Sequence, residues 1–160
     1  MAPTIDLDPI DRRLLGILQE DCSLTVQQIS EAVGLSPNPV WRRIKRLEAE
    51  GVIQRRVALL SPEAVGLPMT VFVSIKTNRH DVAWLDSLAA AMSRIPEIVE
   101  AHRMSGDIDY LLKILVQDVG HYDRVYRKLI TAVPGLSDVS SSFSMERLKS
   151  TTAIDLAAIV

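Results

Sequence analysis

Apolar residues follow two different periods along the chain. Up to about residue 50 they recur at three- and four-residue intervals, which is the spacing of helices with one buried face. From Met69 to Ile75 they stand at every second position, which is typical of a strand with one buried face. We therefore expect an α+β protein with a helical first part and a mixed second part.

Capping residues predict three helices in the first part. Asp8 suits the cap of a helix that runs to about residue 20, and Thr25 suits the cap of a second helix, Val26–Val33. Ser36 suits the cap of a third helix, which Gly51 ends. The four-residue turn VGLS joins the second helix to the third. Two helices joined by such a short turn follow the plan of a helix-turn-helix.

The third helix has an apolar stripe and a basic face. At about 100° per residue, Ile44 and Leu47 fall within about 40° of Val40, so this stripe is predicted to be buried. Arginine pairs with guanine edges in the DNA major groove, asparagine pairs with adenine, and lysine neutralises phosphate. This composition favours double-stranded DNA as a partner, and an ordinary solvated helix is the alternative. The face opposite the stripe carries Asn38, Arg42, Lys45 and Arg46, with Trp41 and Arg43 on its flanks.

Basic charge is concentrated around this helix. The whole chain has a net charge of −2, whereas the segment from Ser36 to Arg56 carries six basic and two acidic residues. A local basic patch on a mildly acidic protein indicates a directed electrostatic footprint. The segment Val52–Leu60 is predicted to be a strand or wing, in which Arg55 and Arg56 either touch phosphates or line a solvated strand edge.

The second part predicts the element order β-α-β-β-α-β. This is the ferredoxin-like arrangement, with an antiparallel sheet and both helices on one face. The other face needs a cover, and a second copy of the chain is the expected one. After the hinge-like stretch SPEAVGLP come a strand at 69–75, helices near Val82–Met92 and Tyr122–Ile130, and strands at Ile98–Met104, Tyr110–Val116 and Val139–Leu148.

The turn SGDIDYLL carries the most chemistry in the second part. Gly106 permits close approach of a ligand to the backbone. The carboxylates of Asp107 and Asp109 can accept from an ammonium group, and free backbone N–H groups can hold a carboxylate. This set suits an amino acid. An ordinary hairpin turn, for which Gly and Asp are common choices, is the alternative.

Other features narrow the class of protein. The single cysteine, Cys22, excludes an internal disulfide framework and fits a reducing cytoplasm. No apolar run approaches the roughly 20 residues that span a bilayer, so no membrane association is expected. The histidines His80, His102 and His121 are widely spaced, without a metal-ligand motif. No catalytic residue, metal or cofactor is predicted, and the chain is not expected to be an enzyme.

With both parts considered, the sequence resembles the Lrp/AsnC (feast/famine) family of prokaryotic transcription regulators. The resemblance extends from about Ile5 to Leu156. It is carried by LDPIDRRLLGILQEDCSLTVQQISEAVGLSPNPVWRRIKRLEAEGVI, SGDIDYLLKILV, VPGLSDVSSSF and LKSTTAI, and the first of these is the most specific. Two positions depart from the family pattern: Ile108 stands where the family often has an aromatic residue, and Trp41 where it usually has a small one.

The resemblance implies a winged helix-turn-helix domain at 1–53, a linking strand and hinge at 54–66, and a ferredoxin-like effector-sensing and oligomerisation domain at 67–160. It implies dimers that assemble into octameric discs and a small effector, typically an amino acid. An architectural DNA-binding protein without an effector, or an enzyme similar to sirohaem decarboxylases, are the alternatives. The implied DNA contacts are Ser36, Asn38, Trp41, Arg42, Arg43, Lys45 and Arg46, and the implied effector contacts are Gly106, Asp107, Asp109, Tyr110, Ser142 and Thr152.

Overall fold

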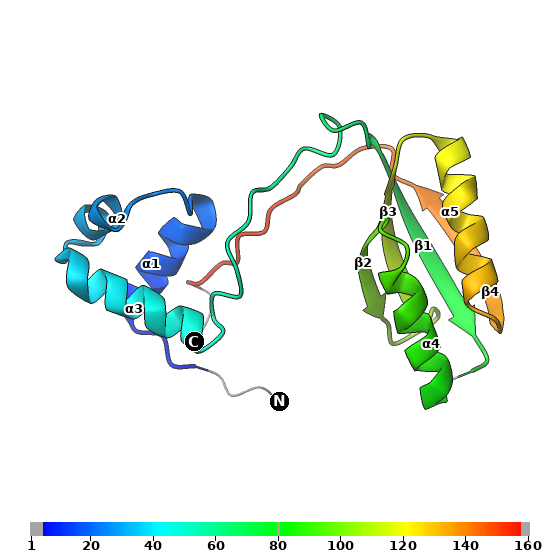
Figure 1. Ribbon diagram of the computed structural model, residues 1–160, viewed down its shortest axis with the longest axis horizontal. Coiled ribbons are helices and arrows are strands. Elements are labelled where there is room, and N and C mark those ends of the chain that lie inside the picture. Colours follow the sequence, from blue (N-terminus) through cyan, green and yellow to red (C-terminus); the bar gives the residue numbers. More distant parts are fainter. Residues whose placement is uncertain (1–4, 80, 158–160) are drawn as a thin grey trace. The chain divides into compact units, whose positions relative to one another are not determined.

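The chain forms two compact units in a computed structural model that describes residues 5–79 and 81–157 (Figure 1). One unit comprises the residues up to Ala58 together with the C-terminal tail from Lys149. The other unit is Leu59–Leu148. The predicted C-terminal domain, 67–160, included the tail, whereas the contacts of the tail lie with the first unit. There Gln19 of the first helix exchanges two side-chain hydrogen bonds of 2.9 Å with the backbone of Ile154.

The first unit is the predicted trihelical core. Its helices are α1 (Pro9–Glu20), α2 (Val26–Val33) and α3 (Pro37–Ala49). Asp8 and Thr25 each form a capping box, and Gly34 ends α2 in the left-handed conformation with φ of +71°. The buried side chains come from one face of each helix: Leu14, Leu18, Ile29, Val33, Val40 and Ile44.

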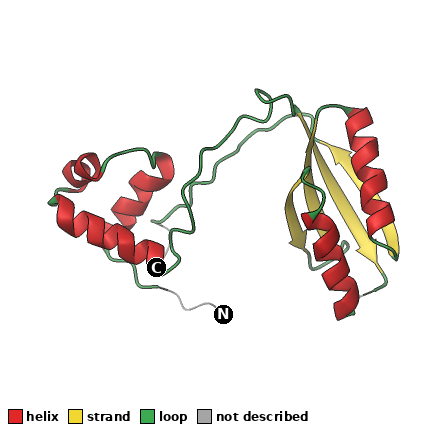
Figure 2. Cartoon of the chain, viewed as in Figure 1, coloured by secondary structure: helices red, strands yellow, loops and turns green. Residues whose placement is uncertain are grey.

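The second unit is a four-stranded antiparallel sheet with two helices (Figure 2). The strand order is β2-β3-β1-β4, so the first and third strands of the unit are central. This confirms the ferredoxin-like prediction. The elements are β1 (Met69–Thr77), α4 (Val82–Ser93), β2 (Ile98–Arg103), β3 (Tyr110–Val116), α5 (Val119–Ala132) and β4 (Leu136–Phe143).

The two faces of this sheet differ in burial. On one face, alternate residues of β1 and β3, such as Val73 and Leu112, pack into a single core with Leu88 of α4 and Leu129 of α5. Both helices therefore cover the same face. On the other face Phe72 lies between Lys113 and Ser142 in the strand register, and its side chain is 38% exposed.

One predicted strand does not form within the described residues, and another begins and ends earlier than predicted. The segment 54–61 has no regular secondary structure, although a strand or wing was expected at Val52–Leu60. A strand needs a hydrogen-bonded neighbour, and within the described residues this segment pairs with none. The last strand begins at Leu136 and ends at Phe143, not at Leu148. Its pairing with β1 begins with Leu136 opposite Thr77, and the register shifts between Lys76 and Thr77.

Candidate functional site

The outward face of α3 is fixed by the stripe that lies beneath it. Val40, Ile44 and Leu47 are all buried, as their spacing predicted. Because three side chains along this 13-residue helix are buried, the helix cannot rotate about its axis, and its opposite face remains turned toward solvent. The exposed residues on this side include Ser36, Asn38, Trp41 and Arg42, and the Ser36 side chain makes no capping hydrogen bond.

Arg42 is the unpaired cation of this face. Its side chain is exposed, and within the described part of the chain it makes no hydrogen bond or ion pair. A guanidinium group has five donors in a planar fork, which matches guanine edges and phosphate. Arg42 therefore presents its full donor set to an incoming ligand.

Arg43 and Arg46 are engaged by carboxylates of the first helix. The Nη1 atom of Arg43 donates to Asp8 Oδ2 at 2.5 Å and to Asp11 Oδ1 at 2.8 Å. The Nη2 atom of Arg46 donates to Asp11 Oδ2. The Arg43 side chain is only 27% exposed, and the bonds to Asp8 and then to Asp11 raise its pKa further. These two arginines connect α3 to the N-terminus of α1.

Lys45 and Arg56 share one acidic partner. Lys45 Nζ lies 2.7 Å from Glu48 Oε2, and Arg56 Nη2 lies 3.0 Å from Glu48 Oε1. The hydrogen bond from Lys45 holds the pKa of Glu48 below its ordinary value, with Arg56 adding to the effect. Both cations remain exposed, so these pairs are weak and can exchange for phosphate.

Residues of the predicted effector turn have very different surroundings. Gly106 has φ of +121°, a conformation that favours glycine, and Asp107 is exposed. Asp109 instead fastens the turn to the end of β1. Its Oδ2 accepts from the backbone N–H of Thr77 at 2.8 Å, and its own N–H donates to the carbonyl of Ile75 at 2.9 Å.

The other predicted effector residues do not gather at this turn. Tyr110 is buried beside Trp84, with ring centroids 5.9 Å apart, and its hydroxyl has no partner within the described residues. Ser142 is exposed on β4, opposite Phe72 on the face without helices. Thr152 belongs to the tail that packs with the first unit. In a single chain the turn brings together Gly106 and Asp107 with the anchored Asp109.

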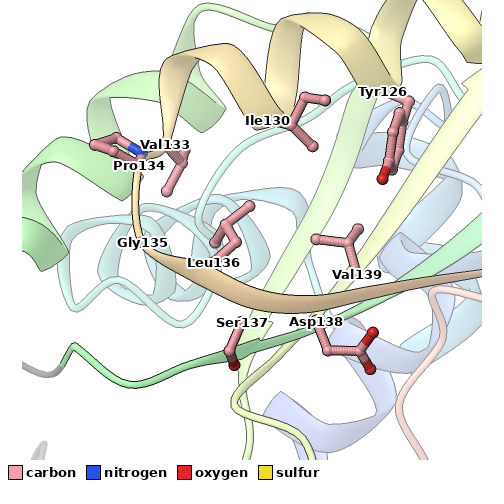
Figure 3. Close-up of a pocket in the computed structure, with 9 residues that line it drawn as sticks. All are labelled: Tyr126, Ile130, Val133, Pro134, Gly135, Leu136, Ser137, Asp138 and Val139. Atoms are coloured by element: carbon pink, nitrogen blue, oxygen red, sulfur yellow. The ribbon is translucent and has the colours of Figure 1, made fainter.

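A hollow of about 380 Å³ lies between the C-terminal half of α5 and the start of β4 (Figure 3). Tyr126 and Ile130 of the helix and Leu136 and Val139 of the strand line it. None of the predicted effector residues is among the lining residues.

No three His, Cys, Asp or Glu side chains of the described residues are grouped as metal ligands, and no described helix has the length and apolar character needed to cross a bilayer. His102 is exposed and His121 lies 3.3 Å from Glu97, while His80 lies outside the described residues.

Comparison with known families matches both units. Residues 70–154 match the Lrp/AsnC ligand binding domain, and residues 7–54 match the winged helix-turn-helix DNA-binding domain. The chain belongs to the Lrp/AsnC family. Membership confirms the resemblance expected from the sequence and the pairing of a winged helix-turn-helix with a ferredoxin-like domain.

Several known proteins align over almost the whole chain. The DNA-binding transcriptional activator DecR of Escherichia coli K12 is 47% identical over 150 residues, which are 94% of this chain and 99% of DecR. The crystal structure of an AsnC family transcriptional regulator from Agrobacterium tumefaciens has a TM-score of 0.92 at 47% identity, covering 96% of this chain and all of that one. A Neisseria meningitidis transcriptional regulator in complex with L-methionine has a TM-score of 0.90 at 33% identity, covering 97% and 100%.

The partners of the basic residues could be inferred only in part from the sequence. Glu48 is three residues from Lys45 on one helix, so their pair follows from helical spacing. Asp8 and Asp11 lie more than 30 residues before the arginines that they bind. The sequence identified Asp8 as a helix cap, but the contact of Asp8 and Asp11 with α3 depends on tertiary packing.

Proposed function

We propose that this Lrp/AsnC family member is a sequence-specific DNA-binding transcriptional regulator that reads the major groove with the outward face of α3. Arg42 and Asn38 contact base edges, and Trp41 contacts a base or sugar edge. Ser36 and Lys45 contact phosphates. The observation that carries the proposal is the unpaired, exposed guanidinium of Arg42 on a helix whose rotation is fixed by three buried side chains. Arg43 and Arg46 anchor α3 to the start of α1 through Asp8 and Asp11.

We propose that the chain acts as a homodimer through the sheet face that no helix covers. Support comes from exposed apolar side chains in the second unit, including Phe72 at 38% and Val99 at 46%. A hollow of about 250 Å³ lined by Leu67, Val99 and Leu115 adds further apolar surface. A dimer presents two copies of α3 to half-sites about 34 Å apart, or a multiple of that distance, and dimers assemble further into octamers.

The proposed effector is an amino acid that binds beside Gly106 and Asp107. Support comes from the exposed carboxylate of Asp107 next to a turn whose glycine backbone leaves room for a ligand. The L-methionine complex of the Neisseria regulator supports the chemical class. Asp109 and Tyr110 would shape the turn, because one is bonded to β1 and the other is buried. Ser142 and Thr152 remain candidates for contacts that a second copy would complete.

We propose that effector binding and DNA binding influence one another through the oligomeric assembly of the chain. An amino acid shifts the balance between two assemblies only by its different affinity for each, a coupling of typically 1–3 kcal/mol. We propose no catalytic role, since DecR and the two regulators of known structure are named as regulators.

DNA binding is tested by fluorescence anisotropy with the intergenic region upstream of the protein's own gene and with a scrambled duplex of equal length. We expect tighter binding to the upstream region, and affinities for both duplexes that fall steeply as salt increases. Equal, salt-insensitive affinities for the two duplexes would contradict the proposal.

Effector binding is tested by thermal shift against the twenty amino acids, followed by calorimetry of any that bind. An amino acid at 100 times its dissociation constant adds about 2.7 kcal/mol to stability. Asp107→Asn should weaken binding without loss of folded structure. Absence of any shift would instead favour the architectural DNA-binding alternative.

A further inference from the structure

Asp11 lies at the centre of a charge cluster between α1 and α3. Its side chain is only 1% exposed, and both of its oxygens are occupied. Oδ1 accepts from Arg43 at 2.8 Å, while Oδ2 accepts from Arg46 and, at 3.3 Å, from the backbone N–H of Asp8. A buried carboxylate that accepts from three donors binds its arginines strongly. Removing either arginine would leave a buried negative charge incompletely paired in a low-dielectric environment, which is costly.

The cluster divides the arginines of α3 into two kinds. Arg43 and Arg46 extend toward α1, whereas Arg42 has no partner within the described residues. The Arg46 side chain is still 43% exposed, so a small movement away from Asp11 would turn its guanidinium group to solvent. Its Nε atom also lies 3.7 Å from Glu50 Oε2. The charge of Arg46 is thus near the proposed DNA surface but held by Asp11.

We propose that Asp11 is a positioning residue that withholds Arg46 and Arg43 from DNA and thereby limits the sequence-independent part of the affinity and its dependence on salt. The inference rests on the proposed function. Cations that reach phosphates strengthen binding to every sequence equally, whereas base contacts discriminate between sequences. Retaining two arginines on the carboxylates of α1 lowers affinity for every duplex while leaving the base-reading contacts of Arg42 and Asn38 in place.

The direct test is Asp11→Asn, measured by anisotropy on the scrambled duplex over a range of salt concentrations. The amide keeps the size of the side chain but loses its charge, and Asp8 still holds Arg43. Arg46 is released and gains one phosphate contact. We expect the slope of log affinity against log salt to become steeper by about 0.9, and affinity for the scrambled duplex at 0.1 M salt to rise roughly eightfold. Affinity for the upstream duplex should rise by the same factor, so the ratio of upstream to scrambled affinity should stay unchanged.

Two matched variants separate this effect from general charge and from loss of structure. Asp6→Asn removes the same charge from an exposed position before α1 and should leave the slope unchanged. Arg46→Gln in the otherwise native chain should also leave the slope unchanged, because a held arginine contacts no phosphate. In Asp11→Asn/Arg46→Gln the slope should return to the native value. Circular dichroism establishes that each variant is folded.

The inference is overturned if Asp11→Asn leaves the slope unchanged, if Asp6→Asn steepens it equally, or if the double variant stays steep. A loss of about 0.9 from the slope in Arg46→Gln alone also overturns it, and this measurement decides the matter even if Asp11→Asn does not fold. These readouts use random DNA. If the native chain shows no preference for the upstream region, the proposed function fails, whereas the slopes still test the position of Arg46.

Discussion

The outward face of α3 and the turn at 104–109 differ in how their charged residues are held in place. The α3 face is set by three buried side chains and by arginine bonds to α1, so its free groups are in place within one unit of one chain. The turn is held by the backbone and by the Asp109 side chain, and it contributes one exposed carboxylate, Asp107. The comparison teaches that the proposed DNA-reading surface is formed within one chain, whereas the proposed sensing turn needs further groups.

The largest expected effect is a loss of stability in one unit while the other unit stays folded. Ile44→Ala removes a side chain from the core of the first unit and should cost about 2–5 kcal/mol of its unfolding free energy. DNA binding should be lost at lower temperature than in the native chain, while amino-acid binding persists. Calorimetric unfolding and the fluorescence of Trp84, which is buried in the second unit, measure this. Ile114→Ala in the sheet core is the matched variant with the opposite pattern.

If Ile44→Ala destabilises both units by the same amount, their independence is refuted. The α3 face would then depend on the cooperative folding of the whole chain.

Arg42→Ala tests the completeness of the α3 face. Loss of this side chain should cost about 1–3 kcal/mol of binding to the upstream region and reduce the discrimination against the scrambled duplex, because an arginine that reads a base contributes to specificity. Arg55→Ala is the comparison, since an exposed arginine that meets only phosphate should weaken binding to both duplexes alike. An Arg42→Ala variant with native affinity for both duplexes would remove Arg42 from the interface.

Asp109 and Asp107 should give opposite results in the sensing turn. Asp109→Ala leaves the Thr77 N–H without its acceptor and should lower stability of the second unit by about 1–2 kcal/mol. Asp107→Ala, at an exposed position, should change stability by less than about 0.5 kcal/mol and weaken amino-acid binding. Denaturant unfolding and calorimetry measure the two effects. The reverse assignment would mean that Asp109 leaves Thr77 to bind the ligand.

Much of the fold was predictable because it depends on local signals. The capping residues Asp8 and Thr25 and the stripe through Ile44 placed the first three helices. Alternation placed β1, and a strand-like run placed β3. A strand or wing was expected at Val52–Leu60, and no strand forms there, because the pattern of apolar residues carries no information about a pairing partner.

The candidate site was predictable only as a set of residue types. Helical spacing identified which side chains of α3 point outward, including Arg42. It did not show that Arg43 and Arg46 would meet carboxylates from another helix, because a count of charge along a segment omits partners that folding brings from elsewhere. For the same reason two aspartates of one turn, Asp107 and Asp109, looked equivalent, although only Asp109 bonds to β1.

The smallest expected effect concerns acid stability of the two units. Asp8 caps α1, and the N–H of Asp11 followed by the Arg43 side chain lowers its pKa below the ordinary value near 3.8. A carboxyl with a lowered pKa stabilises the fold above its ordinary pKa, and this contribution is lost as pH falls through the folded value. Because the Asp8 side chain is 44% exposed, the contribution should be less than about 1 kcal/mol. Asp8→Asn should therefore flatten the decline in stability of the first unit between about pH 5 and pH 3.

Asp81 provides the parallel measurement in the second unit. It caps α4, and the N–H of Trp84 followed by the Arg79 side chain lowers its pKa in the same direction. Asp81→Asn should flatten the acid decline of the second unit and leave that of the first unaltered, as resolved by calorimetric scans at several pH values. Each variant is the control for the other, because both remove one capping carboxylate. If either variant changes both transitions, acid sensitivity is shared between the units, and the stability of the first unit depends on the state of the second.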